Sequence, residues 1–276
     1  MKAVCDLCPH HCALEPGQTG LCRARTNRDG KIVCSNYGKI TALALDPVEK
    51  KPLRRFFPGN FILSIGSYGC NLRCPFCQNS EISMTGPQTD MVSMTPEELT
   101  AKAVELSGRP GGNLGAAFTY NEPLIGYEYV RDCAVLLHRA GLKTVLVTNG
   151  YVCEEPLRKL LPLIDAMNID LKGFTEDYYK WLGGDLETVK QTIAVSAARC
   201  HVEVTTLVVP GKNDAESEME AEASWLASLN PEIPLHISRF FPRYRLEDIA
   251  PTPVDTVYRL CGIARKHLQY VYPGNC

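Results

Sequence analysis

From residue 61 onward the chain alternates apolar segments of strand length with segments that favour helices. Strands separated by helices form βαβ units, in which the strands run parallel in one sheet. Six such units are predicted, too many for a flavodoxin-like sheet and too few for an eight-fold barrel. We therefore expect an α/β fold, a partial (β/α)6 TIM-like barrel, over residues 61–276. The predicted strands are 61–65, 114–120, 143–148, 166–171, 202–209, 235–240 and a short last one, 269–272.

Helix signals fill the spaces between these strands. The clearest is Thr95-Pro96-Glu97-Glu98, a capping-box sequence with proline at the first helical position, which predicts a helix that ends near Ser107. The other predicted helices are 123–139, 154–161, pieces within 175–199, 215–229 and 253–267.

Residues 1–60 are predicted to form a Cys-rich N-terminal segment followed by a connector. The turn residues Asp29 and Gly30 indicate a hairpin that enters a strand, and the apolar residues 39–45 are a candidate partner for that strand. Residues 46–59 contain three prolines and four basic residues. A run of this kind is typical of an extended, solvated connector, so we assign it no catalytic role.

Three cysteines, Cys70, Cys74 and Cys77, follow the first predicted barrel strand at C-x3-C-x2-C spacing. Iron–sulfur clusters are normally held by four thiolates, so three would leave one iron open to bind a small molecule. The alternatives are a zinc knuckle or buried free thiols. A structural zinc site needs four closed ligands, and no further Cys or His lies near Cys77 in the sequence, so the spacing favours the cluster.

A second group of cysteines, Cys5, Cys8, Cys12 and Cys22, lies in a turn-rich N-terminal stretch. Four thiols in so short a segment can close a tetrahedral zinc site that folds an otherwise coreless region. A second iron–sulfur cluster fits the same ligands equally well. The remaining alternative is a mobile or partly oxidised thiol tail.

Polar and ionisable residues recur where the predicted strands end. In parallel α/β folds the site lies at the carboxyl ends of the strands. Each residue alone could be a turn residue, a helix-start carboxylate or a surface pair, but together around the cysteine loop they predict a binding site. They are Glu122, Thr148, Asn149, Gly150, Asp170, Lys172, residues 210–214, His236, Ser238 and Arg239.

Composition excludes several classes of function. The net charge of -2 offers no basic surface for nucleic acid or an anionic membrane. The sequence begins without a signal peptide and contains no run of membrane-spanning length, so we expect a cytoplasmic protein. In that compartment, 13 cysteines at clustered spacings indicate metal binding rather than a disulfide framework.

The segment 69–79, with Phe76 just before the third cysteine, resembles the radical S-adenosylmethionine (radical SAM) superfamily. The chain is similar to its pyruvate formate-lyase activating enzymes, which install glycyl radicals, and within that branch it resembles the AmmeMemoRadiSam group. The motifs that carry this further resemblance are Cys5-x2-Cys8-Pro9-His10-x-Cys12, Asp46–Leu53, Thr119–Pro123 and His236–Pro242.

The resemblance implies roles for individual residues. Cys70, Cys74 and Cys77 would hold a 4Fe–4S cluster whose open iron binds the amino and carboxylate groups of SAM. Phe76 would pack near the adenine, and Glu122 would contact the methionine amino group. The other implied cofactor-binding residues are Thr148 and Asn149 in a ribose-contacting segment, Asp170 and Lys172 near the SAM carboxylate or the substrate, and His236 in the last motif.

Three positions depart from the family pattern. Tyr120 and Asn121 stand where the family usually has two glycines before the glutamate. Val147 stands where activating enzymes commonly carry an aspartate that contributes to a monovalent cation site, so the resemblance does not extend to that cation.

The resemblance implies a radical SAM oxidoreductase. Such an enzyme cleaves SAM reductively to a 5′-deoxyadenosyl radical, which abstracts hydrogen from a protein or peptide, here with a glycyl radical enzyme as a candidate partner. A flavodoxin- or ferredoxin-type protein would supply the electron. Radical modification of a small molecule or of another protein side chain is the alternative enzymatic function, and an iron–sulfur electron-transfer protein is the alternative of another class.

Overall fold

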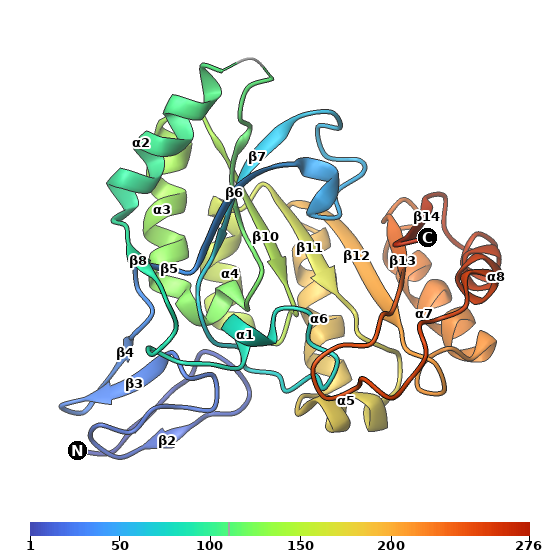
Figure 1. Cartoon of the computed structure of the whole chain (residues 1–276), viewed down its shortest axis with the longest axis horizontal. Coiled ribbons are helices and arrows are strands. Elements are labelled where there is room, and N and C mark those ends of the chain that lie inside the picture. Colours follow the sequence, from blue (N-terminus) through green and yellow to red (C-terminus); the bar gives the residue numbers. More distant parts are fainter. Residues whose placement is uncertain (110) are drawn as a thin grey trace.

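The computed structural model describes residues 1–109 and 111–276. Its main sheet has eight strands in the order β14-β13-β12-β11-β10-β9-β7-β6, which is an open, barrel-like arrangement (Figure 1). All neighbours from β7 to β14 pair in parallel, and only β6 runs antiparallel to β7. The strands are β6 (Ala42–Pro47), β7 (Phe61–Gly66), β9 (Gly115–Phe118), β10 (Lys143–Thr148), β11 (Ala166–Asp170), β12 (His201–Val208), β13 (Leu235–Arg239) and β14 (Val271–Gly274). The predicted partial barrel is confirmed.

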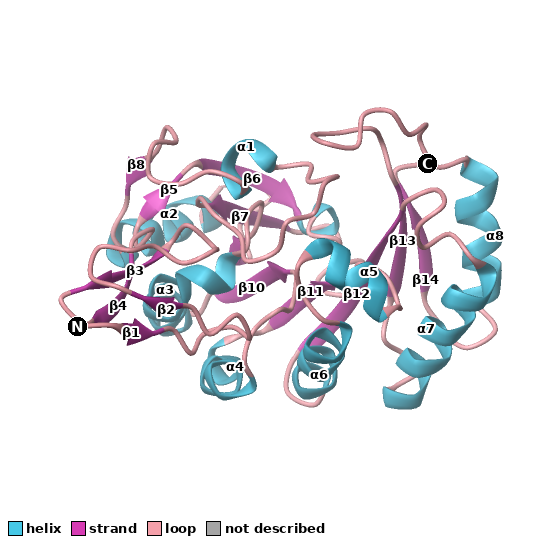
Figure 2. Cartoon of the chain, turned by 90° about the horizontal axis from the view of Figure 1, so that it is seen from below, coloured by secondary structure: helices cyan, strands magenta, loops and turns pink. Residues whose placement is uncertain are grey.

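Helices follow the strands as the alternation predicts, and Figure 2 shows α4, α6 and α7 along the outer side of the curved sheet. The helices are α1 (Ser80–Ser83), α2 (Pro96–Ser107), α3 (Tyr127–Arg139), α4 (Glu154–Leu160), α5 (Glu176–Leu182), α6 (Leu186–Ala197), α7 (Glu216–Leu229) and α8 (Val254–Ala264). Short 3-10 turns η1 (Val48–Lys50), η2 (Pro123–Gly126) and η3 (Leu161–Leu163) complete the set.

The strands are apolar because both faces of the sheet are buried. Leu146, Met167 and Val204 are 0% exposed and belong to the large core beneath the helices. Val145 and Ala166, which alternate with them, belong to a second apolar cluster on the other face. Burial on both faces is what a parallel sheet under crossover helices requires.

The N-terminal region has little regular structure. β1 (Ala3–Val4) pairs with β2 (Ala13–Leu14), and β3 (Arg25–Arg28) pairs with β4 (Lys31–Cys34) around the turn at Asp29 and Gly30. Both turn residues have positive φ, 52° and 87°, which is the conformation of a tight hairpin turn, so the predicted hairpin is confirmed. A further short pair joins β5 (Lys39–Ile40) to β8 (Val92–Ser93).

The expected strand at 39–45 has another partner than predicted. β6 covers most of it and pairs with β7 as the edge strand of the main sheet, not with the hairpin. The two hairpin strands have only four residues each and pair with one another, whereas β6 pairs with the edge strand β7 over six residues.

The division of the chain at residue 60 stays a prediction. Among the described residues, none of the helices has the length and apolar character to cross a membrane.

Candidate active site

A cavity of about 690 Å³ opens at the carboxyl ends of the parallel strands. All three cysteines of the loop line it, so the predicted meeting of loop and strand ends does occur there. Of the residues expected to bind a cofactor, only Thr148 does not line the cavity. Ser238 also lines it, whereas Arg239 and residues 210–214 do not. The expected residues in its wall are Cys70, Cys74, Phe76, Cys77, Glu122, Asn149, Asp170, Lys172 and His236.

The cysteine loop leaves β7 and turns sharply at Gly69, whose φ is +89°. The backbone N–H of Leu72 donates to Cys70 Sγ at 3.4 Å, and the N–H of Arg73 donates to the Leu182 carbonyl at the end of α5. Burial raises the pKa of the Cys74 thiol to about 12, although the ammonium group of Lys172 opposes this shift. A bound metal would remove this cost, because thiols bind metals in their deprotonated form.

The distances between the thiols indicate whether they can hold a single metal ion or an iron–sulfur cluster. Among the residues that the structure describes, no three Cys, His, Asp or Glu side chains are grouped so that they could hold one metal ion. In an iron–sulfur cluster each thiolate binds its own iron, so the ligands surround the group rather than converge on a point. The donor set of Cys70, Cys74 and Cys77 around one cavity therefore fits a cluster better than a zinc knuckle.

Glu122 is the central carboxylate of the rim and is 3% exposed. It accepts hydrogen bonds from the Thr148 hydroxyl at 2.6 Å, from the Asn149 N–H at 2.8 Å and from the Leu124 N–H at 2.9 Å. Burial nevertheless raises the pKa of Glu122 to about 7. Thr148, which the resemblance placed near the ribose, therefore acts on the site by orienting this carboxylate.

Asn149 connects the rim to the cysteine loop. Its side-chain amide donates to Asn71 Oδ1 at 3.0 Å and to Cys70 Sγ at 3.5 Å, and its Oδ1 accepts from the Tyr151 N–H at 2.8 Å. Both ends of the amide are therefore held, so the side chain is preorganised beside the first cysteine.

Asp170 and Lys172 form an ion pair of 2.7 Å at the end of β11. Burial alone would lower the pKa of Lys172, but the charges of Asp170 and of the Cys74 thiolate raise it. The ammonium group therefore stays charged beside the cysteine loop, where it can offset the negative charge of thiolates or bind an anion.

Phe76 and His236 are the last two of the predicted cofactor-binding residues. Phe76 packs against Trp181 with ring centroids 5.9 Å apart, so it forms a rigid apolar part of the wall. His236 Nε2 lies 2.6 Å from Glu203, which is fully buried and also accepts from the backbone N–H groups of Arg54 and Arg55. Through these contacts, Glu203 links the backbone of the connector, residues 46–59, to His236 in the barrel wall.

The connector itself lines the cavity, which sequence reasoning missed. Asp46, Glu49, Lys50, Lys51 and Arg54 all face it. Asp46 accepts from Lys51 Nζ and from the Tyr120 hydroxyl, each at 2.8 Å. The signal in the sequence was an acidic and a basic residue around Pro47, but nothing local showed that β6 would carry them to the rim.

An open parallel barrel with a three-cysteine loop at the carboxyl ends of its strands defines a class of iron–sulfur barrel enzymes. The sequence profile described as "Radical SAM superfamily" matches residues 64–223, which include the loop and the rim up to β12 and α7. The chain belongs to the radical SAM superfamily. Its cofactors are accordingly those of the family, a 4Fe–4S cluster and SAM.

Several known proteins are similar to this chain. An uncharacterized protein of Methanocaldococcus jannaschii, MJ0808, is 40% identical over 99% of this chain and 81% of its own length. Pyruvate formate-lyase 1-activating enzyme of Escherichia coli is 22% identical over 72% of this chain and 86% of its own length. The crystal structure of Streptococcus suis SuiB bound to S-adenosylmethionine has a TM-score of 0.58 at 12% identity and covers 78% of this chain and 52% of SuiB.

Proposed function

We infer that this protein cleaves SAM reductively at a cluster held by Cys70, Cys74 and Cys77 and abstracts hydrogen from a protein or peptide, in the manner of a glycyl-radical-enzyme activase. The observation that carries the proposal is that these thiols share one cavity with Glu122, Asn149 and Asp170. An iron–sulfur electron carrier would need the cysteines but no such rim. When bound, the cluster and SAM together supply a 5′-deoxyadenosyl radical.

The residues of the chain bind and orient the cofactor. The Glu122 carboxylate, already held by Thr148, is placed to accept hydrogen bonds from the amino group of SAM. Lys172, charged beside Asp170, suits the SAM carboxylate, and Phe76 supplies an apolar surface for the adenine. Asn149 is held close to Cys70 and suits the ribose. Leu72, Phe76, Val147 and Leu207 form the apolar part of the cavity wall, and a radical reaction requires that water be kept away from the reacting atoms.

The choice of a protein or peptide substrate rests on similarity. One named relative, pyruvate formate-lyase 1-activating enzyme, aligns over most of both chains. Lys50 and Arg54 of the connector line the cavity wall, so a substrate that enters the cavity meets these two basic side chains. A flavodoxin- or ferredoxin-type protein is the proposed reductant.

A spin-detection experiment tests the substrate class. The anaerobically reconstituted enzyme is mixed with SAM, dithionite and a purified glycyl radical enzyme from the same organism, and the mixture is frozen for electron paramagnetic resonance (EPR). The proposal predicts a protein-based glycyl radical and 5′-deoxyadenosine in matching amounts. 5′-Deoxyadenosine without a radical on the partner would refute the activase function and favour a small molecule or another side chain as substrate.

The Cys74→Ala variant separates failure of the substrate assignment from failure of the chemistry. It should lose 5′-deoxyadenosine release with every partner, whereas Cys200→Ala, outside the cavity, should retain it. Full activity of Cys74→Ala would mean that the cluster is held elsewhere.

A further inference from the structure

We propose that Cys5, Cys8, Cys12 and Cys22 hold a second iron–sulfur cluster, separate from the three-cysteine loop and packed against its back. All four line one small cavity in the N-terminal region. Cys5, Cys8 and Cys22 are buried, with exposures of 6%, 9% and 6%. This inference does not depend on the substrate or on the activase function.

Backbone geometry brings the four thiols together. Cys5 follows β1 and Cys12 precedes β2, and the N–H of Cys5 donates to the Cys12 carbonyl at 3.0 Å. Cys8 lies in the turn between the two strands, and Cys22 comes from the loop that follows β2. The two paired strands have only two residues each, too few to hold such a loop by their own hydrogen bonds. A metal centre would supply the missing link.

An unpaired cationic donor lies in the same cavity wall. Arg25 is 8% exposed, and both of its terminal nitrogens bind the Glu128 carboxylate of α3, at 2.5 and 2.9 Å. Its Nε is buried and has no hydrogen-bond partner among the described residues. A buried donor of this kind is costly unless a ligand accepts from it. A cluster with four thiolates would provide both an acceptor and negative charge for the guanidinium.

The separation of the thiols favours a cluster over zinc. The four thiols line one cavity, yet within the described residues no three of them are grouped closely enough to hold one ion. Tetrahedral zinc requires all four sulfurs about 2.3 Å from the same point. In a cluster each cysteine binds a different iron, so the sulfurs stand farther apart than zinc ligands do.

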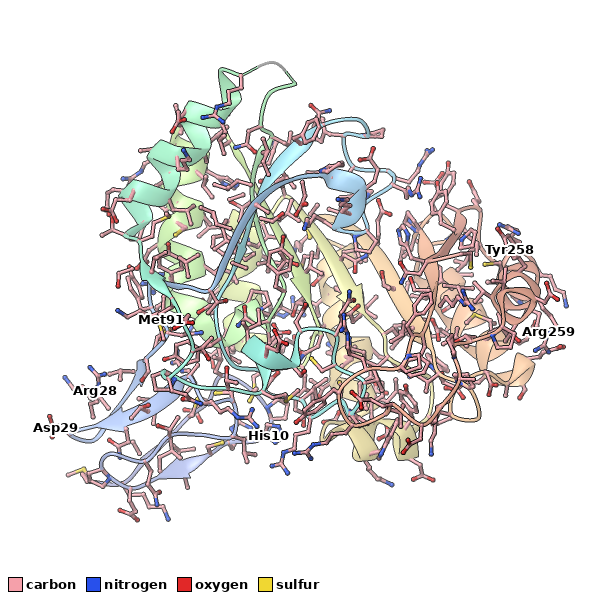
Figure 3. All side chains as sticks on the ribbon, in the orientation of Figure 1. His10, Arg28, Asp29, Met91, Tyr258 and Arg259 are labelled. Carbon is pink, nitrogen blue, oxygen red and sulfur yellow. The ribbon has the colours of Figure 1, made fainter. Side chains whose placement is uncertain are left out.

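The proposed cluster would adjoin the catalytic loop directly. A Cβ at Gly69 would lie 2.3 Å from the Cys22 carbonyl oxygen, so the two loops are in tight contact. The backbone carbonyl oxygen of Asn71 lies 2.8 Å from His10 Nε2, so the catalytic loop also contacts the turn that carries Cys8. Figure 3 shows His10 on the side of the N-terminal region that faces the barrel, away from the hairpin tip at Asp29. Asn71, which follows Cys70 in the chain, thus contacts His10, which comes two residues after Cys8.

The test removes the catalytic loop's cysteines and counts what remains. The full-length Cys70/Cys74/Cys77 triple-alanine variant is reconstituted anaerobically and analysed for iron, sulfide and zinc, and its reduced form is examined by EPR. We expect about four iron and four sulfide per chain, against about eight of each in the parent protein. Adding Cys5→Ser, Cys8→Ser, Cys12→Ser and Cys22→Ser should remove this remainder. Replacing Cys34, Cys153 and Cys200, which do not line the cavity, should leave it unchanged.

Several outcomes would overturn the proposal. They are a folded triple variant without iron, a triple variant that holds zinc instead, and a parent protein that binds only about four iron. The last count uses the unaltered chain, so it decides the matter even if the triple variant does not fold. If the proposal holds, the Cys8→Ser variant should also alter the EPR signal of the remaining catalytic cluster, because Asn71 joins the two sites.

Discussion

At the scale of single residues, Gly69 is where the two cysteine regions meet. Its φ of +89° favours glycine, and its missing Cβ leaves room for the Cys22 carbonyl. We predict that Gly69→Ala lowers iron in the catalytic loop and reduces 5′-deoxyadenosine release at least about tenfold, because backbone must move to relieve the contact. Gly59→Ala is the matched control, since Gly59 has a φ of +83° but nothing within 4 Å of the added carbon. Equal effects of the two substitutions would contradict this explanation.

Glu122 should contribute mainly to SAM binding. Glu122→Gln keeps the shape of the side chain but removes the charge that pairs with the amino group of SAM. A hydrogen bond to a charged group is worth about 1.5–3 kcal/mol, so the dissociation constant for SAM should rise roughly 10- to 150-fold. Equilibrium binding to the reconstituted enzyme measures this, with Glu232→Gln on the exposed surface as control. Unchanged affinity would remove Glu122 from the cofactor site.

Glu222, outside the site, should make stability depend on pH. Burial raises the pKa of Glu222 to about 8 from 4.5, and the nearby Glu218 carboxylate adds to the shift. The Thr206 oxygen lies 2.5 Å from Glu222 and 3.0 Å from the Leu171 carbonyl. One hydroxyl hydrogen cannot serve both acceptors, which favours a protonated Glu222 that donates to Thr206.

The sign of this effect follows from proton linkage. The folded state binds the Glu222 proton more tightly than the unfolded state, so this contribution to stability is full below pH 4.5 and declines as pH rises to about 8. The slope is at most about 1.4 kcal/mol per pH unit. Urea unfolding should show Glu222→Gln gaining stability relative to the parent between pH 5 and pH 8. Parallel curves for the two proteins would contradict the buried proton.

At the scale of elements, α2 tests a prediction made from local sequence. Its capping box is present: the Thr95 hydroxyl accepts from the Glu98 N–H at 3.2 Å, and the Glu98 carboxylate accepts from the Thr95 N–H at 2.7 Å. Thr95→Ala should lower the free energy of unfolding by about 1 kcal/mol. It should not change SAM cleavage, because α2 does not line the cavity. Thermal unfolding of the Thr95→Ala variant measures this loss. Thr100→Ala, a substitution inside the same helix that leaves the capping box intact, is the control.

The barrel strands could be predicted because each is a local pattern. Segments such as Lys143–Thr148 are apolar on both faces and are bounded by turn residues, so their length and type are visible in sequence. β6 was assigned the wrong partner because pairing depends on which sheet edge is free, and no local pattern encodes that. The same reason explains why Asp46 and Lys51 were missed: they reach the cavity only because β6 lies beside β7.

The rim could be predicted from topology alone. Parallel strands end at one edge, so residues such as Glu122 and Asp170, far apart in sequence, had to meet there. What topology could not show is how they are held. Thr148 donates a hydrogen bond to Glu122, and Asn149 donates one to Cys70. Both hydrogen bonds depend on side-chain rotamers, which are set by packing.

At the scale of the whole molecule, the barrel supplies one face for the cofactor and the N-terminal region supports the loop from behind. The connector closes the third side, where Glu203 binds both His236 and the backbone of Arg54 and Arg55. The barrel, the N-terminal region and the connector therefore each contact the segment 69–79 or the cavity that it lines. This organisation makes the chemistry at that loop the central claim.

The most direct test is to count the products of SAM cleavage. Anaerobically reconstituted protein is incubated with dithionite and SAM, and 5′-deoxyadenosine and methionine are quantified by chromatography. We predict that the two products appear in equal amounts and that Cys74→Ala forms neither. An unchanged SAM pool in the presence of a fully loaded, reduced cluster would contradict the account.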